Sequence, residues 1–268
     1  MIIEAFSNPV MQPWHYVLIV IGFAIAICLA VAFRKFDDGK NRKLLMILGI
    51  LFPLGEVFKQ ILMAKVIGYQ EYPLSLLPLQ FCLIPLYILL PMALLKDGVV
   101  KRALYNYMVS FSLVAATVYL FSGIWTTQPS SAFEVHEFVW HAAVVFVSFY
   151  IALSGRIDTN IKGVLGALSV FAILVGIGLL SNELLRDVSD NTTNFFFLGQ
   201  GNPGIYILKV ITASIGRTSA NLGFQSGFGA LSVTAFLVMC IPSLVRERIA
   251  AKSKIAAEPE RIYSIREF

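Results

Sequence analysis

The residues with the clearest chemical potential are ionisable or nucleophilic side chains inside long apolar stretches. Glu56 and Lys59 stand three positions apart, which places them on one face of a helix. Cys82 and His141 each lie in a different apolar stretch. A charged side chain within hydrocarbon costs roughly 2.5–3.5 kcal/mol. Such residues therefore indicate a binding or catalytic site that faces the interior of a helix bundle.

A cysteine and a histidine can together perform nucleophilic catalysis. The thiolate, and not the thiol, attacks a carbonyl carbon, so Cys82 would need a base beside it. His141 is a candidate for that base, and Glu137 stands one helical turn before it, where its carboxylate can accept a hydrogen bond from the ring. The pattern predicts Cys82 and His141 as catalytic residues and Glu137 as the residue that orients the histidine.

Each of these residues also has a purely structural interpretation. A single cysteine in an apolar stretch is typical of a small buried side chain. His136 and His141 lie near the start of an expected span, where histidines commonly serve as interface residues. Glu56 and Lys59 can form an ion pair that only packs two helices together. The sequence leaves these alternatives open.

Metal and cofactor motifs are absent from the sequence. The histidines of HEFVWH, His136 and His141, are five positions apart, whereas a zinc-binding HExxH pattern places them four apart. Cys28, Cys82 and Cys240 are far from one another and form no CxxC pair. We therefore expect neither a metal nor a cofactor.

The composition excludes a water-soluble globule. Of 268 residues, 57% are apolar and 14% are charged, against about 45–50% and roughly 25% in soluble domains. The mean hydropathy is +0.77. The net charge of +5 comes from basic residues between apolar runs, so it indicates membrane orientation rather than a nucleic-acid partner.

Seven apolar segments are long enough to be spans, because each needs about 20 residues. Their continuous apolar character predicts helices rather than the alternating strands of a barrel. We expect an all-α, multi-pass cell-membrane protein with a single seven-helix domain over residues 1–245. The predicted spans are His15–Phe33, Leu44–Ile67, Pro78–Leu95, Ala103–Ser122, Glu137–Ser154, Ile161–Leu180 and Gly223–Val245.

The loops divide into two sets with very different numbers of Lys and Arg. Residues 34–43, 96–102, 155–162 and the tail after Val245 carry 16 of them. The opposite set carries Arg186, Lys209 and Arg217, and Lys65 if it lies beyond its helix. This asymmetry predicts an outside N-terminus and a cytoplasmic C-terminus. Residues 246–268 mix six basic with four acidic residues, which predicts a disordered tail.

The expected topology places the candidate residues at similar depth. Counted at about 1.5 Å per residue, Lys59, Cys82 and His141 lie roughly 6–12 Å below the outer ends of their spans. Asn182 and Asn194 lie at or beyond the outer end of the sixth span. The apolar piece Ile205–Ile215 is too short to cross a bilayer, so it is expected to be interfacial or re-entrant.

Several short stretches, in this order, resemble the YwaF family of seven-span bacterial membrane proteins. They are Glu56–Lys59, LPLQFC at Leu77–Cys82, His136–His141, Asn182, and NFFFLGQGNP at Asn194–Pro203. Animal relatives of that family include a membrane acyltransferase that acts on ether-linked phospholipids. The resemblance implies that Cys82 and His141 carry acyl transfer. This chain differs from the family at one position, because the family often has a histidine where this chain has Gln80. Glutamine cannot take up a proton.

Two functions follow as hypotheses. The first is a phospholipid acyltransferase with a Cys82–His141 pair near the outer leaflet, acting on phospholipid and lysophospholipid. The second is a small-solute transporter or binding module that uses Glu56 and Lys59 without chemistry. Gln80, Asn182 and Asn194 are expected to orient or bind the ligand in either case. A purely structural role for the charged pair is the third interpretation.

Overall fold

Long apolar stretches can satisfy their backbone polar groups in lipid only as helices, and every regular element of the described residues is helical. The computed structural model describes residues 11–67, 74, 77–127, 130–200 and 206–264. In chain order the elements are α1 (Pro13–Phe33), α2 (Asp38–Ile67), η3 (Phe81–Leu83), α3 (Pro85–Leu94), α4 (Val99–Tyr107), η4 (Met108–Ser112), α5 (Leu113–Ser122), η5 (Ile124–Thr127), α6 (Ser131–Leu153), α7 (Ile161–Leu184), η6 (Phe195–Phe197), α8 (Tyr206–Ile215) and α9 (Arg217–Ser264).

Six helical stretches in the described residues are long and apolar enough to cross a membrane. They are α1, α2, the continuous stretch α4–η4–α5, α6, α7 and the first part of α9. The expected third span, Pro78–Leu95, is shorter, because helical structure there covers only Phe81–Leu94. That stretch rises about 21 Å, against a hydrocarbon thickness of about 30 Å. The described residues thus contain six full-length candidate spans and one shorter apolar helix, and the count of seven crossings stays a prediction.

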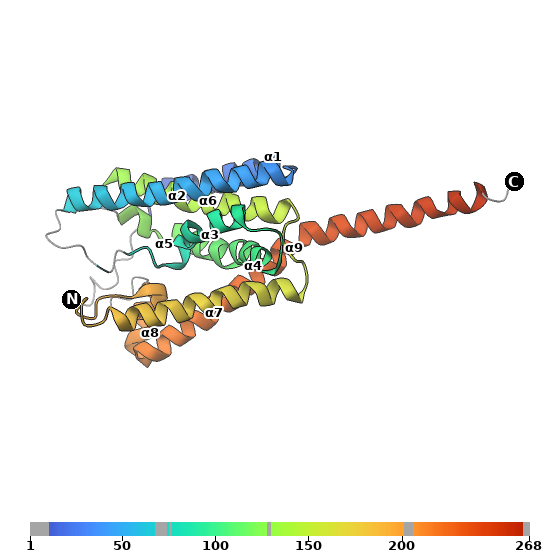
Figure 1. Ribbon diagram of the computed structural model, residues 1–268. Helices are drawn as coiled ribbons and strands as arrows, with labels where there is room; N and C mark the ends of the chain where they lie inside the picture. The colour runs from blue at the N-terminus through green and yellow to red at the C-terminus, as the bar shows by residue number, and fades with distance from the viewer. Residues whose placement is uncertain (1–10, 68–73, 75–76, 128–129, 201–205, 265–268) are drawn as a thin grey trace.

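The helices form a layered bundle (Figure 1). Helix α1 packs against α6, α2 against α3, and α4 against α7. The stretch α4–η4–α5 runs through the middle and contacts α6, α7 and α9. The long helix α9 begins beside α8 and projects well beyond the other helices at its C-terminal end (Figure 1). The middle stretch is consequently the element that the other helices surround.

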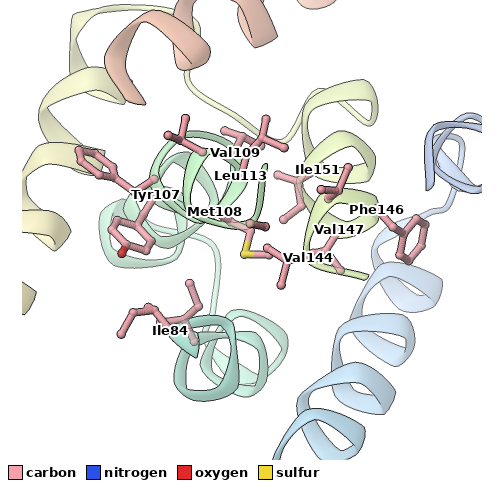
Figure 2. Packing of buried hydrophobic residues seen from close by; sticks show 14 of the residues in the cluster. Ile84, Tyr107, Met108, Val109, Leu113, Val144, Phe146, Val147 and Ile151 are labelled. Atoms are coloured by element: carbon pink, nitrogen blue, oxygen red, sulfur yellow. The ribbon is translucent and has the colours of Figure 1, made fainter. Parts of the chain in front are cut away.

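A turn of π-helix lies at the centre of that middle stretch. Residues Met108 to Ser112 are all buried. The wider turn leaves the Met108 carbonyl within reach of α6, where the Ser148 hydroxyl donates a hydrogen bond to it at 2.8 Å. Figure 2 shows Met108 of this turn lying beside Val144 of α6. The π-turn therefore locks the central helix to α6.

The outer helices expose apolar side chains over most of their length. On α1 these include Val17, Val20 and Ile25, and on α7 Leu165 and Ile173. Helices that are apolar all round while only one side packs on protein match the surface that a lipid environment requires. The structure supports a multi-pass membrane protein.

The loops that carry most Lys and Arg lie together at one end of the bundle. Arg156 donates a hydrogen bond to the Phe36 carbonyl at 2.9 Å, and Arg102 pairs with Asp158 at 3.0 Å. The loops that precede α2 and α7 and the start of α4 therefore meet at this end. The sequence predicts all of them on the same side of the membrane. Which end faces the cytoplasm stays a prediction.

Several predicted boundaries were wrong, because α2, α6 and α9 each begin six residues earlier than predicted. Helix α6 begins at Ser131 instead of Glu137, which places His141 about 15 Å along its helix rather than 6 Å. The expected disordered tail continues α9 as helix to Ser264. Ala, Lys, Glu and Arg dominate this stretch, and these residues favour helix once a preceding helix has nucleated it.

Gly49 allows α2 and α3 to approach closely, which gives a test of this packing. A Cβ atom at position 49 would lie 2.8 Å from the Leu90 backbone nitrogen, whereas at Gly176 of α7 it would meet nothing within 4 Å. We expect Gly49→Ala to lower the free energy of unfolding by about 1–3 kcal/mol. Gly176→Ala is the control and should be neutral or stabilising. Equal thermal unfolding temperatures of the two variants in detergent would contradict the close packing.

Candidate functional site

The charged residues predicted from the sequence come together between α2 and α6. The ammonium Nζ of Lys59 lies 2.8 Å from Glu56 Oε2 and 3.8 Å from Glu137 Oε1. The three side chains are only 5–13% exposed. One lysine therefore compensates a carboxylate of its own helix and a carboxylate of the neighbouring helix, which is the arrangement that makes buried charges tolerable.

Glu137 also contacts two histidines of its own helix. Its Oε1 lies 3.7 Å from His136 Nδ1, and its Oε2 lies 3.8 Å from His141 Nδ1. The Tyr119 hydroxyl of α5 donates a hydrogen bond to the same carboxylate. We call Glu56, Lys59, His136, Glu137 and His141 the polar cluster. Its centre is Glu137, which links α2, α5 and α6.

His141 is completely buried and held in one orientation. Its ring stacks on Tyr119 with the ring centroids 3.8 Å apart and the planes 7° from parallel. Its Nδ1 lies 2.6 Å from the main-chain carbonyl oxygen of Glu137. A carbonyl oxygen only accepts hydrogen bonds, so Nδ1 carries the proton and Nε2 of the neutral ring keeps a lone pair. Within the described residues, Nε2 is buried without a hydrogen-bond partner.

The predicted means of orienting His141 needs correction. The sequence indicates the Glu137 carboxylate, but the close contact is made by the Glu137 main-chain carbonyl. The carboxylate lies farther from the ring because Lys59, His136 and Tyr119 surround it. Glu137 thus positions the histidine through its backbone and closes the polar cluster through its side chain.

Cys82 lies in η3 and is attached to α6 through its backbone. The Trp140 indole Nε1 donates a hydrogen bond to the Cys82 carbonyl at 3.2 Å, so the residue before His141 fixes the position of the cysteine. Cys82 also lines a cavity of about 450 Å³ together with Tyr119, Phe197 and Phe228. Among the described residues no hydrogen bond joins the Cys82 thiol to His141. Tyr119 lines the cavity together with Cys82 and also stacks on His141.

Gln80, Asn182 and Asn194 form a separate group that holds the segment 193–199 inside the bundle. Asn182 accepts a hydrogen bond from the Phe195 nitrogen at 2.9 Å and donates one to the Phe195 carbonyl at 3.0 Å. Gln80 donates to the Asn194 carbonyl at 3.3 Å, and the Asn194 side chain accepts from the Gly199 nitrogen at 3.0 Å. All three contact main-chain groups of this segment rather than the polar cluster.

The segment 193–199 carries strained backbone that these contacts support. Phe196 and Phe197 have φ angles of 53° and 59°, in the left-handed region that costs a non-glycine residue of order 1–3 kcal/mol. Phe196 is fully buried, with its ring 4.7 Å from that of Phe81. This buried turn precedes Ile205–Ile215, the piece expected to be interfacial or re-entrant. Residues Tyr206–Ile215 form α8, which packs against α9, and the choice between the two positions stays a prediction. The neighbouring residues 201–205 lie outside the described residues.

Sequence reasoning missed the polar residues of α9 that complete this support. Arg217 and Asn221 donate hydrogen bonds to the Gly199 carbonyl at 3.0 and 3.3 Å, and Gln225 donates to the Phe196 carbonyl at 2.6 Å. They recur every four residues along an otherwise apolar helix. That spacing places them on one face, so the pattern could have identified them. Tyr119 was also missed, and nothing in its neighbourhood in the sequence points to His141.

The polar cluster contains a base, a cation and two carboxylates. Within the part of the chain that the structure describes, no group of three or more His, Cys, Asp or Glu side chains is arranged to hold a metal ion. What the arrangement can do is accept a proton at His141 Nε2 beside an apolar cavity.

Residues 10–215 match the family model of the TMEM164 family. The chain belongs to the TMEM164 family. The match covers the polar cluster, Cys82 and the segment 193–199, and it ends just before α9. It confirms a transmembrane protein family, in agreement with the six apolar helices. The match names neither the YwaF family nor an acyltransferase, so both stay predictions. No curated protein and no solved structure matches the chain.

The buried ion pair of this TMEM164-family protein can be tested against an exposed pair of the same geometry. Glu183 and Arg186 are also three residues apart with a 2.8 Å contact, but they are 67% and 50% exposed. We expect Lys59→Met to lower the free energy of unfolding by about 3–5 kcal/mol, because it leaves two buried carboxylates without their cation. Arg186→Met should cost about 0–1 kcal/mol.

The corresponding double variants separate the energy of the ion pair from the cost of removing each side chain alone. Glu56→Gln/Lys59→Met should be less destabilised than the sum of its single variants, with a coupling of about 0.5–3 kcal/mol. Glu183→Gln/Arg186→Met should show almost none. Thermal or denaturant unfolding in detergent measures both cycles. A coupling equal in the two pairs would show that burial does not strengthen the Glu56–Lys59 interaction.

Proposed function

We propose that this protein is a seven-helix enzyme of the cell membrane that transfers a fatty acyl chain between glycerophospholipids through a thioester on Cys82. The observation that carries the proposal is the position of Cys82 in the wall of an apolar cavity that Tyr119 also lines. Tyr119 also stacks on His141, whose Nε2 is buried without a hydrogen-bond partner in the described residues and carries a lone pair in the neutral ring. In this topology Phe81–Leu94 completes the seventh crossing, the N-terminus faces outside and the C-terminus is cytoplasmic.

The cavity suits an acyl chain. Its volume of about 450 Å³ falls within the range of about 300–1,000 Å³ for small-molecule sites. Its walls are aromatic and aliphatic, with Phe197, Ile211, Phe224 and Leu231 among them. Cys82 and Gln80 also line it. A hydrocarbon chain in this space would place its carboxyl end near the thiol.

The proposed reaction takes place in two balanced steps. His141 Nε2 takes the thiol proton, and the thiolate attacks the ester carbonyl of a phospholipid. The C–S bond forms, the C–O bond breaks, and the departing lysophospholipid oxygen receives the proton. In the second step the hydroxyl of another lysophospholipid gives its proton to His141 and attacks the thioester. The new C–O bond forms, and the thiolate leaves and is reprotonated.

Proton transfer requires the thiol and the imidazole to approach during this cycle, directly or through one water molecule. Catalytic hydrogen bonds are commonly long before substrate binds. Lys59 acts here as a positioning residue, because Glu56 and Glu137 already engage its charge. Gln80 cannot serve as a base, and it instead holds the Asn194 carbonyl.

The other two cysteines provide matched controls for the nucleophile. Cys28 is exposed on α1 and Cys240 is buried on α9, and neither lines the cavity. We expect Cys82→Ala to abolish acyl exchange between labelled phosphatidylcholine and lysophospholipid in reconstituted vesicles. Cys28→Ala and Cys240→Ala should retain exchange within about twofold of the unmodified protein, because their thiols are remote from the cavity.

Retained exchange in a folded Cys82→Ala variant would remove Cys82 from the mechanism. A protein that shows no exchange, but binds or takes up a solute in a manner that depends on Glu56 and Lys59, would instead support the transport hypothesis. Folding of each variant is verified by its thermal unfolding profile.

The acyl-chain cavity can be shortened at Gly227. A Cβ atom at Gly227 would meet nothing within 4 Å, and the same holds at Gly223, one turn earlier on α9. Gly227 lines the cavity and Gly223 does not. We expect Gly227→Leu to shift exchange toward shorter acyl chains by about tenfold in relative rate, because it fills the cavity. Gly223→Leu should leave the chain-length profile unchanged. Identical profiles would show that the chain binds elsewhere.

A further inference from the structure

A second cavity lies at the opposite end of the bundle from Cys82. Its volume is about 470 Å³, and it is formed by the first turn of α2, the last turn of α3, the start of α4 and the turn at Gly155 and Arg156. It lies about 25 Å along α2 from Lys59. Its walls are polar and charged, in contrast to the apolar cavity beside Cys82.

The lining of this cavity has an excess of positive charge. Two acidic side chains, Asp38 and Asp97, face five basic ones. The basic residues are Arg42, Lys96, Lys101, Arg102 and Arg156. A cavity with one dominant sign of charge concentrates ions of the opposite sign.

The acidic residues compensate only two of these cations. Arg102 pairs with Asp97 and with Asp158 at 3.0 Å each, and a hydrogen bond from Arg102 lowers the pKa of Asp97. Arg156 pairs with Asp38 at 3.2 Å. Among the described residues, no carboxylate lies within 4.0 Å of Arg42, Lys96 or Lys101. Three cations therefore remain uncompensated around the cavity.

The floor of the cavity is rigid and supplies further donors. Asn41 is buried, donates to the Tyr105 hydroxyl at 3.1 Å and accepts from the Tyr150 hydroxyl at 2.8 Å. Arg156 is fixed by its bond to the Phe36 carbonyl, and its Nε is buried without a hydrogen-bond partner in the described residues. Gly155, with φ at +73°, makes the turn that brings Arg156 inward. A guanidinium held in position in the wall of a cavity is suited to an oxyanion.

We propose that this cavity binds a phosphate group, carried by a phospholipid headgroup of the adjacent leaflet or by a soluble phosphate compound. Phosphate offers several acceptor oxygens and more than one negative charge, which match the three uncompensated cations and the positioned guanidinium of Arg156. The cavity is large enough for a headgroup and lies at the end of the bundle predicted to be cytoplasmic. The proposal is independent of the chemistry proposed for Cys82.

The test removes two uncompensated cations and compares them with two cations that lie outside the cavity. Arg42→Gln/Lys96→Gln changes lining residues that pair with no carboxylate among the described residues. Arg34→Gln/Lys35→Gln removes the same two residue types from the same end of the bundle. Each double variant loses two positive charges, so the two variants have equal net charge. A general electrostatic effect should therefore weaken phosphate binding equally in both. The protein is placed in phosphatidylcholine nanodiscs at low ionic strength.

Two probes distinguish the sources of the phosphate. Inorganic phosphate is titrated by calorimetry, and phosphatidic acid is offered in the nanodiscs and its retention measured by native mass spectrometry. We expect at least one probe to bind the unmodified protein and the Arg34/Lys35 variant equally. The Arg42/Lys96 variant should bind it at least about fivefold more weakly. Retention of phosphatidic acid alone identifies a headgroup site, and binding of free phosphate identifies a soluble ligand. Binding of neither probe, or equal loss in both double variants, would overturn the proposal.

Discussion

The arrangement of the site depends on a carboxylate that must remain compensated far from water. Glu137 lies between Lys59 of α2, Tyr119 of α5 and the two histidines of its own helix. A buried charge is tolerated only when such partners surround it, so three helices are drawn to one point. The main chain of the same residue fixes the His141 ring and selects its tautomer. Charge compensation and proton chemistry are therefore coupled at one position.

A second constraint shapes the cavity beside Cys82. The segment 193–199 contains only the short helical turn η6, and its other buried main-chain groups need partners elsewhere. Asn182 and Gln80 supply some of them, and Gln225 of α9 supplies another. The fixed segment presents Phe197 to the cavity. Asn182 and Gln80, which the sequence indicates as possible ligand contacts, thus support an apolar wall of the cavity beside Cys82.

Much of the architecture could be predicted from the sequence, because long apolar stretches admit only helices in lipid. The grouping of the basic loops at one end could also be predicted from the sequence. The short third helix was not, since apolar composition at Pro78–Leu95 does not reveal that helix begins only at Phe81. The proximity of Lys59 to Glu137 and the stacking of Tyr119 on His141 depend on how helices rotate against one another. The spacing of Arg217, Asn221 and Gln225 did contain information that periodicity could have revealed.

The central claim is that Cys82 becomes acylated, with His141 as the base. The most direct measurement is the mass of the peptide that contains Cys82 after the protein has been incubated with a phospholipid of one defined acyl chain. The account predicts that this peptide gains the mass of that acyl group, that hydroxylamine removes it, and that a folded His141→Ala variant does not acquire it. An unmodified Cys82 peptide under conditions in which acyl exchange proceeds would contradict the account.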